Sequence, residues 1–179
     1  MSGRRTVTTI LVVLPLIIAA CSSTIGLDPS AQGPPWIPPD SAWKVVENLE
    51  YAWCTQDIEL VFNSLDEAFE HRLLEEDWDD YNGDGIIDEY WDKYFELAFT
   101  EEIFNAADSI YMDISGTAEW PWSGDSTGQC LELQRSVYLE IHYPDSVEAS
   151  SLTVVFVCRP DRDGTWFIWL LFDQSEASE

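Results

Sequence analysis

Residues 80–88, with the sequence Asp-Tyr-Asn-Gly-Asp-Gly-Ile-Ile-Asp, form the stretch whose side chains are best suited to chemistry. Their spacing is that of the first nine positions of a calcium-binding loop of the EF-hand type, with Gly85 at the sixth position, where the loop turns sharply. Carboxylate and amide oxygens at this density suit Ca²⁺, which is the one cofactor that the sequence suggests. The predicted ligands are Asp80, Asn82, Asp84 and Asp88.

The twelfth position of this loop departs from the calcium pattern. It holds Trp91, where an EF-hand loop carries a glutamate that binds the ion with both oxygens. Glu89 or Asp92 would have to replace that ligand, and the affinity would then be weak. The alternative is an acidic turn whose glycines serve only the backbone geometry and whose carboxylates are solvated.

Catalytic chemistry has less support. The two histidines, His71 and His142, are the candidate acids or bases. Their candidate partners are Tyr111, Tyr138 and Asp113. No spacing links these residues into one constellation, and the sequence contains no glycine-rich phosphate loop, Ser-His-Asp order or nucleophile elbow. We therefore assign no catalytic residue from the sequence.

Nine tryptophans are many for a chain of 179 residues. Five of them could line a pocket for an apolar ligand, or for a cationic ligand attracted to the ring faces. These are Trp43, Trp53, Trp91, Trp166 and Trp169. The alternative for each is ordinary packing between helices and sheet. Trp120 and Trp122 lie among turn residues, where burial is harder, and predict a contact surface for a partner.

A helix is expected over residues 41–53, because apolar side chains recur there at helical spacing. They are Ala42, Val45, Val46, Leu49, Ala52 and Trp53. Asp40 or Ser41 is placed to cap this helix, and Asp57 is placed to cap a shorter helix after it. The helix needs an apolar partner surface, which the later alternating segments can supply.

The middle of the chain contains one segment with two possible structures. Residues 66–74 fit the spacing of a helix or of a strand, and propensity favours the helix. An acidic loop follows over residues 75–88. Aromatic residues from Tyr90 onward then repeat at helical spacing and predict a helix that ends near Phe104.

Alternating apolar residues mark the last third of the chain as strands. The predicted strands cover residues 110–114, 131–141, 152–158 and 165–172. Residues 119–128, with a proline and two glycines, are predicted to form a long turn. Helices followed by consecutive antiparallel strands define an α+β class. We predict a cone-like fold with N-terminal helices packed on a curved, mainly antiparallel sheet, a domain at 41–173 and an acidic tail at 174–179.

The first forty residues carry targeting signals. Residues 1–20 have a basic start and an apolar run too short to span a bilayer, which is typical of a secretory signal peptide. The ending Ile18-Ala19-Ala20-Cys21 resembles a bacterial lipobox, which implies cleavage before Cys21 and lipid attachment to its thiol. Residues 21–40, rich in proline, would then be a tether. Ser22 stands where an inner-membrane retention signal would have aspartate, so the outer membrane is favoured.

Charge and cysteine content exclude further classes. With 34 acidic and 8 basic residues the net charge is −26, which excludes nucleic acid as a partner because phosphates are repelled. An anionic membrane is repelled too, so the N-terminal lipid must hold the protein there. At most one disulfide can form after Cys21. Cys130 and Cys158, in strands predicted to be neighbours, are the favoured pair, with Cys54 left over.

Scattered segments resemble a known family. They are residues 47–53 (Glu-Asn-Leu-Glu-Tyr-Ala-Trp), Asp57-Ile58, residues 85–92 (Gly-Ile-Ile-Asp-Glu-Tyr-Trp-Asp), and Gly164-Thr165-Trp166. Together they resemble the SnoaL-like lipoprotein branch of the nuclear-transport-factor-two-like cone fold. The resemblance implies that Phe69 to Leu73 is the first strand, against its propensity. It also implies a cavity in which relatives such as ketosteroid isomerases and scytalone dehydratases place an Asp or His with a Tyr.

The sequence as a whole predicts a lipid-anchored protein of the bacterial cell envelope. Its cone-fold domain is expected to bind a small apolar or cationic ligand, or a protein partner, without chemistry. One alternative is a small isomerase or dehydratase using His71 or His142, which a closed apolar pocket around either histidine would favour. The other is a calcium-dependent surface interaction module, in which the four loop ligands converge on one ion.

Overall fold

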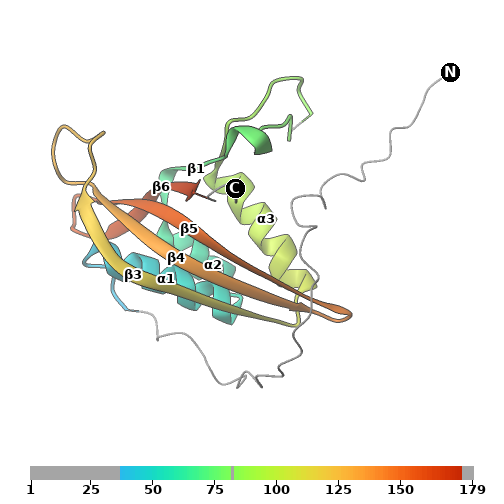
Figure 1. Cartoon of the computed structure of the whole chain (residues 1–179). Helices are drawn as coiled ribbons and strands as arrows, with labels where there is room; N and C mark the ends of the chain where they lie inside the picture. Colours follow the sequence, from blue (N-terminus) through green and yellow to red (C-terminus); the bar gives the residue numbers. More distant parts are fainter. Residues whose placement is uncertain (1–36, 82, 175–179) are drawn as a thin grey trace.

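The computed structural model describes residues 37–81 and 83–174 of the chain. The predicted signal peptide, Cys21, most of the predicted tether, Asn82 and residues 175–179 of the predicted acidic tail lie outside the described residues. The elements follow in the order α1 (Ala42–Thr55), α2 (Ile58–Ser64), β1 (Leu65–Arg72), the 3-10 helix η1 (Glu75–Asp77), β2 (Tyr90–Asp92), α3 (Lys93–Ala106), β3 (Ser109–Pro121), β4 (Leu131–Tyr143), β5 (Ser146–Pro160) and β6 (Trp166–Gln174) (Figure 1).

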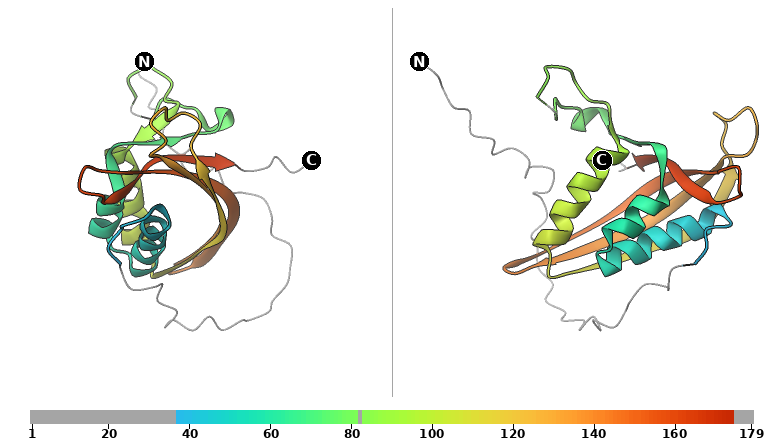
Figure 2. Two further views of the ribbon diagram at one scale, coloured as in Figure 1. Left: turned by 90° about the vertical axis from the view of Figure 1, so that its left-hand side faces the viewer. Right: turned by 180° about the vertical axis from the view of Figure 1, so that it is seen from behind.

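A six-stranded sheet in the order β2-β1-β6-β5-β4-β3 forms the body of the domain. Only β1 and β6 run parallel among these neighbours, and the other pairs are antiparallel. The sheet curls around the helices, which lie on its concave side (Figure 2). We call the face covered by the helices the inner face and the opposite one the outer face. This arrangement confirms the predicted α+β class and the cone-like fold.

The first helix buries the predicted stripe. Ala42, Val45 and Ala52 are at most 1% exposed, and they face the sheet because an apolar stripe gains most from leaving water. Asn48 is also buried, and its amide accepts from the Ile37 N–H at 2.9 Å and donates to the Ile37 carbonyl at 2.6 Å. This pairing fastens the chain that precedes the helix to the domain.

The predicted helix caps are right in one case of two. Asp57 accepts from the Glu59 and Leu60 N–H groups at 3.1 Å and caps α2 as expected. Ser41 stands at the start of α1, but its side chain makes no capping bond. The Asp40 carboxylate instead pairs with the Lys44 ammonium at 2.6 Å.

Residues 65–72 form strand β1, so the helix favoured by propensity is wrong and the strand implied by the family resemblance is right. Tertiary context overrides propensity here because the segment pairs with β6 on one side and β2 on the other. Phe69, 2% exposed, then points inward against the helices.

Helix α3 begins at Lys93 rather than Tyr90, because residues 90–92 pair with β1 as strand β2. Its buried side combines polar and aromatic residues: Lys93 is 2%, Thr100 is 0% and Phe104 is 9% exposed, whereas Tyr94 is 65% exposed. Trp91 and Phe95 instead contact Tyr81 of the acidic loop, at ring-centre distances of 5.4 and 5.9 Å. The helix therefore buries Lys93 and Thr100 together with Phe104.

The two faces of the sheet carry separate apolar clusters. The inner cluster contains most of the core, including Phe156 and Cys158, and the outer one contains Cys130, Val155, Val157 and Leu170. Cys130 and Cys158 therefore lie on opposite faces, because neighbouring residues of a strand alternate. Both thiols are free, and the predicted disulfide is wrong.

Strand β3 extends to Pro121, so the predicted turn begins later than expected.

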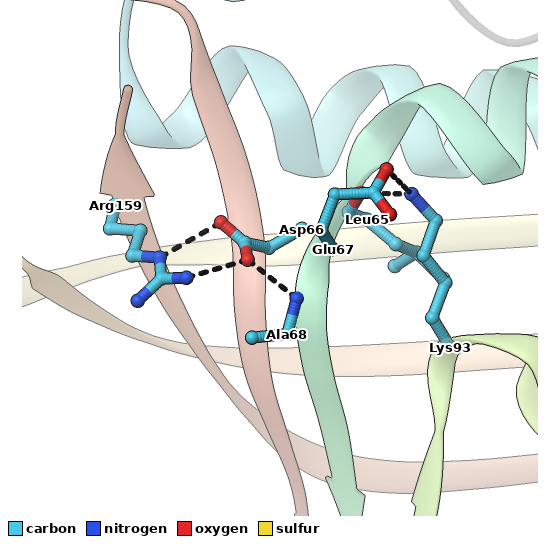
Figure 3. A network of polar contacts seen from close by, with 6 residues as sticks. All are labelled: Leu65, Asp66, Glu67, Ala68, Lys93 and Arg159. Atoms are coloured by element: carbon cyan, nitrogen blue, oxygen red, sulfur yellow. Dashed lines mark hydrogen bonds and ion pairs between the residues drawn. The ribbon is translucent and has the colours of Figure 1, made fainter. Parts of the chain in front are cut away.

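Two basic residues hold the beginning of β1 from opposite sides (Figure 3). The Arg159 guanidinium binds the Asp66 carboxylate through Nε at 2.8 Å and Nη2 at 2.6 Å. The Lys93 ammonium donates to the Leu65 carbonyl at 2.9 Å and to the Glu67 carboxylate at 3.1 Å. The register of β1 against β6 shifts within this segment, so side chains supply the fastening that the strand ladder lacks.

Candidate functional site

A cavity of about 230 Å³ lies on the outer face, beside the loop that joins β3 to β4. It is lined by Trp122, Gly124, Asp125, Thr127, Gln129, Cys130, Arg159, Pro160 and Trp169. We call it the indole pocket. Concave sites with aromatic walls and a few polar groups are typical ligand sites in proteins.

A β-bulge brings Trp169 into this pocket. Val157 pairs with Leu170 and Cys158 pairs with Ile168, so Trp169 is the extra residue of β6. Its ring meets the Trp122 ring edge to face, with ring centres 5.1 Å apart and planes at 88°. Bulges often redirect a side chain next to a functional site.

Gly124 allows the loop to fold closely over Trp122. A β-carbon at this position would lie 2.5 Å from two carbons of the Trp122 ring, which is far inside van der Waals contact. Any larger residue would therefore push Trp122 away from its position against Trp169. The loop sequence is thus matched to the indole that it covers.

Asp125 holds the same loop together. One carboxylate oxygen accepts from the Thr127 N–H at 2.8 Å, and the other accepts from the Gln129 N–H at 2.7 Å and the Cys130 N–H at 2.8 Å. The Thr127 hydroxyl donates to the carboxylate as well. These donors, the Thr127 hydroxyl foremost, hold the pKa of Asp125 well below its usual value. Burial raises the pKa of the adjacent Cys130 thiol to about 11, so it stays protonated.

Arg159 supplies the positive charge in the wall of the pocket. Its guanidinium lies 4.6 Å from the centre of the Trp169 ring, while its Nε and Nη2 bind Asp66 (Figure 3). Burial of Asp66 opposes its ionisation, but the Arg159 bonds and the Ala68 N–H outweigh this and lower the pKa of Asp66. The ion pair that fixes β1 therefore also fixes the orientation of Arg159 in the pocket.

A second cluster lies on the inner face around His71. Its Nδ1 is 2.9 Å from the Glu96 carboxylate of α3, and its Nε2 is 3.6 Å from the Asp173 carboxylate of β6. The Trp91 ring packs against the imidazole at 5.4 Å. Burial alone lowers the pKa of His71, but Asp173 and Glu96 outweigh it and raise the pKa to about 10.

This charge state decides what His71 can do. With a pKa near 10 the imidazole is protonated at neutral pH, and both its nitrogens face carboxylates. An imidazolium held in this way cannot accept a proton as a general base. The charged contacts of His71 link α3, β1 and β6, and this arrangement is suited to stabilising the fold.

His142 lies elsewhere, on the outer face, with its side chain 38% exposed. Its Nε2 is 2.6 Å from the Glu140 carboxylate, which also accepts from the Tyr138 hydroxyl at 2.6 Å. Tyr111 packs against Tyr138, and Asp113 is the cross-strand neighbour of Tyr138. The residues predicted as partners thus gather near His142 outside the cone, and none of them contacts His71.

Three of the four predicted calcium ligands are described, and their carboxylates bind the backbone of their own loop. Asp80 accepts from the Gly83 N–H at 2.8 Å and the Gly85 N–H at 2.9 Å. Asp84 accepts from the Ile86 N–H and Asp88 from the Tyr81 N–H. Across residues 37–81 and 83–174 no group of three or more His, Cys, Asp or Glu side chains is arranged to hold a metal ion. The calcium site stays a prediction.

The tryptophans predicted to line a pocket have different roles. Trp53 and Trp166 pack against the inner core. Trp91 joins the His71 cluster, and Trp43 is 43% exposed beside Lys44. Trp169 lines the indole pocket together with Trp122, which had been predicted as a contact residue. Trp120 lies in β3 and is 46% exposed.

A second hollow, of about 360 Å³, lies across the outer face of the central strands. Its lining is rich in hydroxyl groups: Asp113, Ser115, Ser136, Val137, Tyr138, Ser151, Leu152, Thr153 and Gln174. It lacks the paired indoles and the guanidinium of the indole pocket. We therefore take the indole pocket as the candidate functional site.

Sequence reasoning did not identify the carboxylate partners of His71 or the ion pair between Arg159 and Asp66. Glu96 and Asp173 lie far from His71 in the chain, and Arg159 lies far from Asp66. One local signal was available: Asp125-Ser126-Thr127 has the spacing of a turn in which the aspartate binds the backbone two residues on. It would have predicted an ordered loop.

These features define a nuclear-transport-factor-two-like cone fold, and comparison with known structures agrees. No protein-family model and no curated protein matches the chain. A candidate aromatic ring hydroxylase from Novosphingobium aromaticivorans is similar with a TM-score of 0.57 at 14% identity, over 76% of this chain and 87% of that one. A likeness at this level of sequence identity establishes the fold alone.

Two further solved structures share the fold. A candidate scytalone dehydratase from Novosphingobium aromaticivorans has a TM-score of 0.55 at 10% identity, over 75% of this chain and 80% of that one. A protein of unknown function from Pseudomonas putida, described as NTF2-like, has a TM-score of 0.52 at 8% identity, over 76% and 84%. The predicted SnoaL-like cone fold is thereby confirmed.

His71→Gln should destabilise the domain by about 3 kcal/mol at pH 7, because it leaves two carboxylates without their buried cation. The folded-state pKa of about 10 lies above the ordinary value of 6.5, so the stabilisation is complete below 6.5 and is lost as pH rises through 10. Urea unfolding from pH 6 to 10.5 measures this. His142→Gln is the matched control, with an expected cost of about 0.5 kcal/mol or less. Equal stability of the two variants would contradict the structural role.

If the acidic loop binds calcium, Ca²⁺ should raise the melting temperature and a chelator should reverse the rise, because a ligand that binds only the folded state stabilises it. Calorimetry of the wild type with each addition measures the effect. The double variant Asp80→Asn, Asp84→Asn should lose the response, whereas Asp145→Asn, in the exposed β4–β5 turn, should keep it. A melting temperature that changes with neither calcium nor chelator would contradict the calcium prediction.

Proposed function

We propose that this chain is a lipid-anchored cell-envelope protein whose cone domain binds a small ligand in the indole pocket and performs no chemistry. The observation that carries the proposal is the construction of that pocket. A bulge, a close-packed glycine and a multiply bonded aspartate all act to hold two indoles and a guanidinium around one cavity. Such local organisation exceeds what a connecting loop needs.

The charges in the pocket favour a neutral ligand. Arg159 already occupies a position over the Trp169 ring, so a cationic ligand would have to compete with it. Its charge is balanced by Asp66, and Asp125 adds a negative charge at the rim, which disfavours anions. A ligand with an apolar face and a few hydrogen-bonding groups fits the remaining surface. This refines the expectation of an apolar or cationic ligand.

An isomerase or dehydratase is the competing proposal, and the buried His71 beside Asp173 and Glu96 is the observation in its favour. The protonated state of that histidine opposes it, because acid–base turnover needs a group whose pKa lies near the working pH. Both cavities described above also include outer-face residues rather than His71. Binding is therefore the better supported function.

The lipid anchor rests on the N-terminal sequence, whose residues lie outside the described part of the chain. Among the residues described, no helix is long and apolar enough to cross a membrane. The Asn48 bonds to Ile37 and the bond from the Trp166 N–H to the Pro39 carbonyl at 2.7 Å fasten the start of the domain. A tether that ends in these bonds would be joined firmly to the domain.

Cys21→Ser should abolish incorporation of labelled palmitate and release the protein from the membrane fraction, because one lipid-bearing residue is proposed to supply the whole attachment. Ser22→Asp should keep the lipid but move the protein from the outer-membrane to the inner-membrane fraction. Density fractionation of cell envelopes measures both. Palmitate labelling of Cys21→Ser at the wild-type level would contradict the anchor.

Ligand binding can be read from ¹⁹F NMR of protein labelled with 5-fluorotryptophan. Neutral aromatic probes such as phenol and indole should shift the Trp122 and Trp169 signals together and saturably, and leave the core Trp53 signal in place. Choline and acetate, as charged probes, should shift them less. Gly124→Ala should weaken the response about tenfold by displacing Trp122, whereas Ser126→Ala, an exposed neighbour, should not. Absence of a paired shift for every probe contradicts the pocket proposal.

A further inference from the structure

The second hollow, on the outer face of the sheet, has a volume of about 360 Å³. That volume falls within the range of small-molecule sites in proteins, roughly 300 to 1,000 Å³. We call it the hydroxyl hollow. Its lining comes from β3, β4, β5 and β6, which are neighbours in the sheet (Figure 1). The side chains that line it from the outer face are Asp113, Ser115, Ser136, Tyr138, Ser151, Thr153 and Gln174.

The sheet register arranges these side chains in two adjacent rows. The first row crosses four strands and consists of Ser115, Ser136, Thr153 and Gln174. The second row crosses three strands and consists of Asp113, Tyr138 and Ser151. Neighbouring strands lie about 4.8 Å apart, and residues on one face of a strand recur about every 6.7 Å. Polar groups therefore repeat at short and regular intervals over the floor of the hollow.

The chemistry of this lining selects among classes of ligand. Val137 and Leu152, which also border the hollow, belong to the inner cluster, so the side chains that face outward here are all polar. A purely apolar ligand would leave them without hydrogen bonds. No lining residue is basic and the chain is strongly acidic, which disfavours an anion. Asp113 alone offers a cation a charged partner, so a neutral polar ligand fits the whole lining best.

The hydroxyl groups have hydrogen-bonding capacity to offer such a ligand. The Ser115 hydroxyl donates to the Ser136 carbonyl at the long distance of 3.5 Å. Within residues 37–81 and 83–174, the hydroxyls of Ser136, Ser151 and Thr153 have no hydrogen-bond partner. Each hydroxyl can donate one bond and accept two. A ligand that satisfies several of them together must carry closely spaced groups that both donate and accept, as a polyhydroxylated molecule does.

Tyr138 adds an aromatic ring that its neighbours hold in place. Its hydroxyl donates to the Glu140 carboxylate at 2.6 Å, and the Tyr111 ring packs against it with ring centres 6.0 Å apart. The bond to Glu140 raises the pKa of Tyr138, so the hydroxyl stays protonated and remains a donor. Glu140 is in turn 2.6 Å from Nε2 of His142. The ring is thus oriented in advance, and its apolar face suits the C–H groups on the face of a sugar ring.

We propose that the hydroxyl hollow is a binding site for a neutral saccharide. The sugar hydroxyls exchange hydrogen bonds with Ser136, Ser151 and Thr153, and the Tyr138 ring meets the apolar face of the sugar. The hollow shares no lining residue with the indole pocket, so this site is independent of the function proposed for that pocket.

Glucose and glucuronate are the first probes, because they have nearly the same shape and differ in charge. In ¹⁵N NMR of the whole protein, glucose should shift the Ser136, Ser151 and Thr153 amide signals saturably, and glucuronate should shift them less. The double variant Ser136→Ala, Thr153→Val should weaken glucose binding about tenfold, because it removes two hydrogen-bonding groups. Ser109→Ala, on the outer face of β3 but beyond the hollow, is the matched control and should bind like wild type.

Cellobiose separates two sources of the saccharide. It carries the glucose ring twice, so a hollow that receives part of a glycan chain should bind it more tightly than glucose. Equal binding of the two sugars supports a site for a small free sugar instead. Both results support the hollow as a saccharide site, and the comparison is made on the same three amide signals.

Four results would overturn the proposal. The first is the absence of a saturable shift with either sugar in wild-type protein, which needs no variant to fold. The second is glucuronate binding as tight as that of glucose, and the third is a folded double variant that binds as wild type does. The fourth is a shift of the same amides with protein concentration alone, because a second copy of the chain would then cover the hollow. None of these bears on the indole pocket, whose signals come from Trp122 and Trp169.

Discussion

The ion pair between Arg159 and Asp66 is the interaction on which the rest of the structure depends. It joins β5 to the start of β1 at the point where the ladder between β1 and β6 shifts register. β1 adds to the antiparallel sheet by pairing in parallel with β6. On its other side it pairs with β2, which leads directly into α3. Lys93 secures the same segment from the helix side. Closure of the sheet around the helices thus depends on two side-chain contacts at a break in the backbone pairing.

The same contact connects the fold to the candidate site. Because Asp66 binds two N–H groups of Arg159, the guanidinium is held 4.6 Å from the centre of the Trp169 ring. The bulge in β6 places Trp169 in the pocket. The loop that carries Trp122 completes the arrangement through Asp125. Arg159 therefore has two roles, because it fastens β1 through Asp66 and also forms part of the pocket wall.

Charge is distributed unevenly through the molecule. The chain is strongly acidic, and three of its few basic groups lie at joints between elements. Lys93 joins α3 to β1, Arg159 joins β5 to β1, and His71 as a cation joins α3 to β6. In low dielectric such contacts are stronger and more specific than at the surface. Arg135 differs from these three, because its guanidinium donates to the Ala118 and Gln134 backbone carbonyls and has no carboxylate partner among the described residues.

Local patterns in the sequence determined a large part of the fold. Residue spacing predicted the apolar stripe of α1, the Asp57 cap of α2 and the alternation in β3 to β6. Each of these features is set by residues that are near one another in the chain. The strand at β1 was not readable from propensity, because its partners β6 and β2 are distant in the chain or lie across a loop. The start of α3 was missed for the same reason, since Tyr90 to Asp92 pair with β1.

The candidate sites were decided by the tertiary structure. Trp169 and Trp122 were noticed for their residue type, but only the bulge in β6 and the loop geometry bring the two rings together. Cys130 and Cys158 lie close in the sheet yet on opposite faces, so the sequence could suggest their proximity but not their orientation. The charged partners of His71 and Arg159 come from elements far along the chain. Spacing in a sequence reports which residues share one face of one element; which faces meet depends on sheet order and register, and these are settled only when the whole core packs.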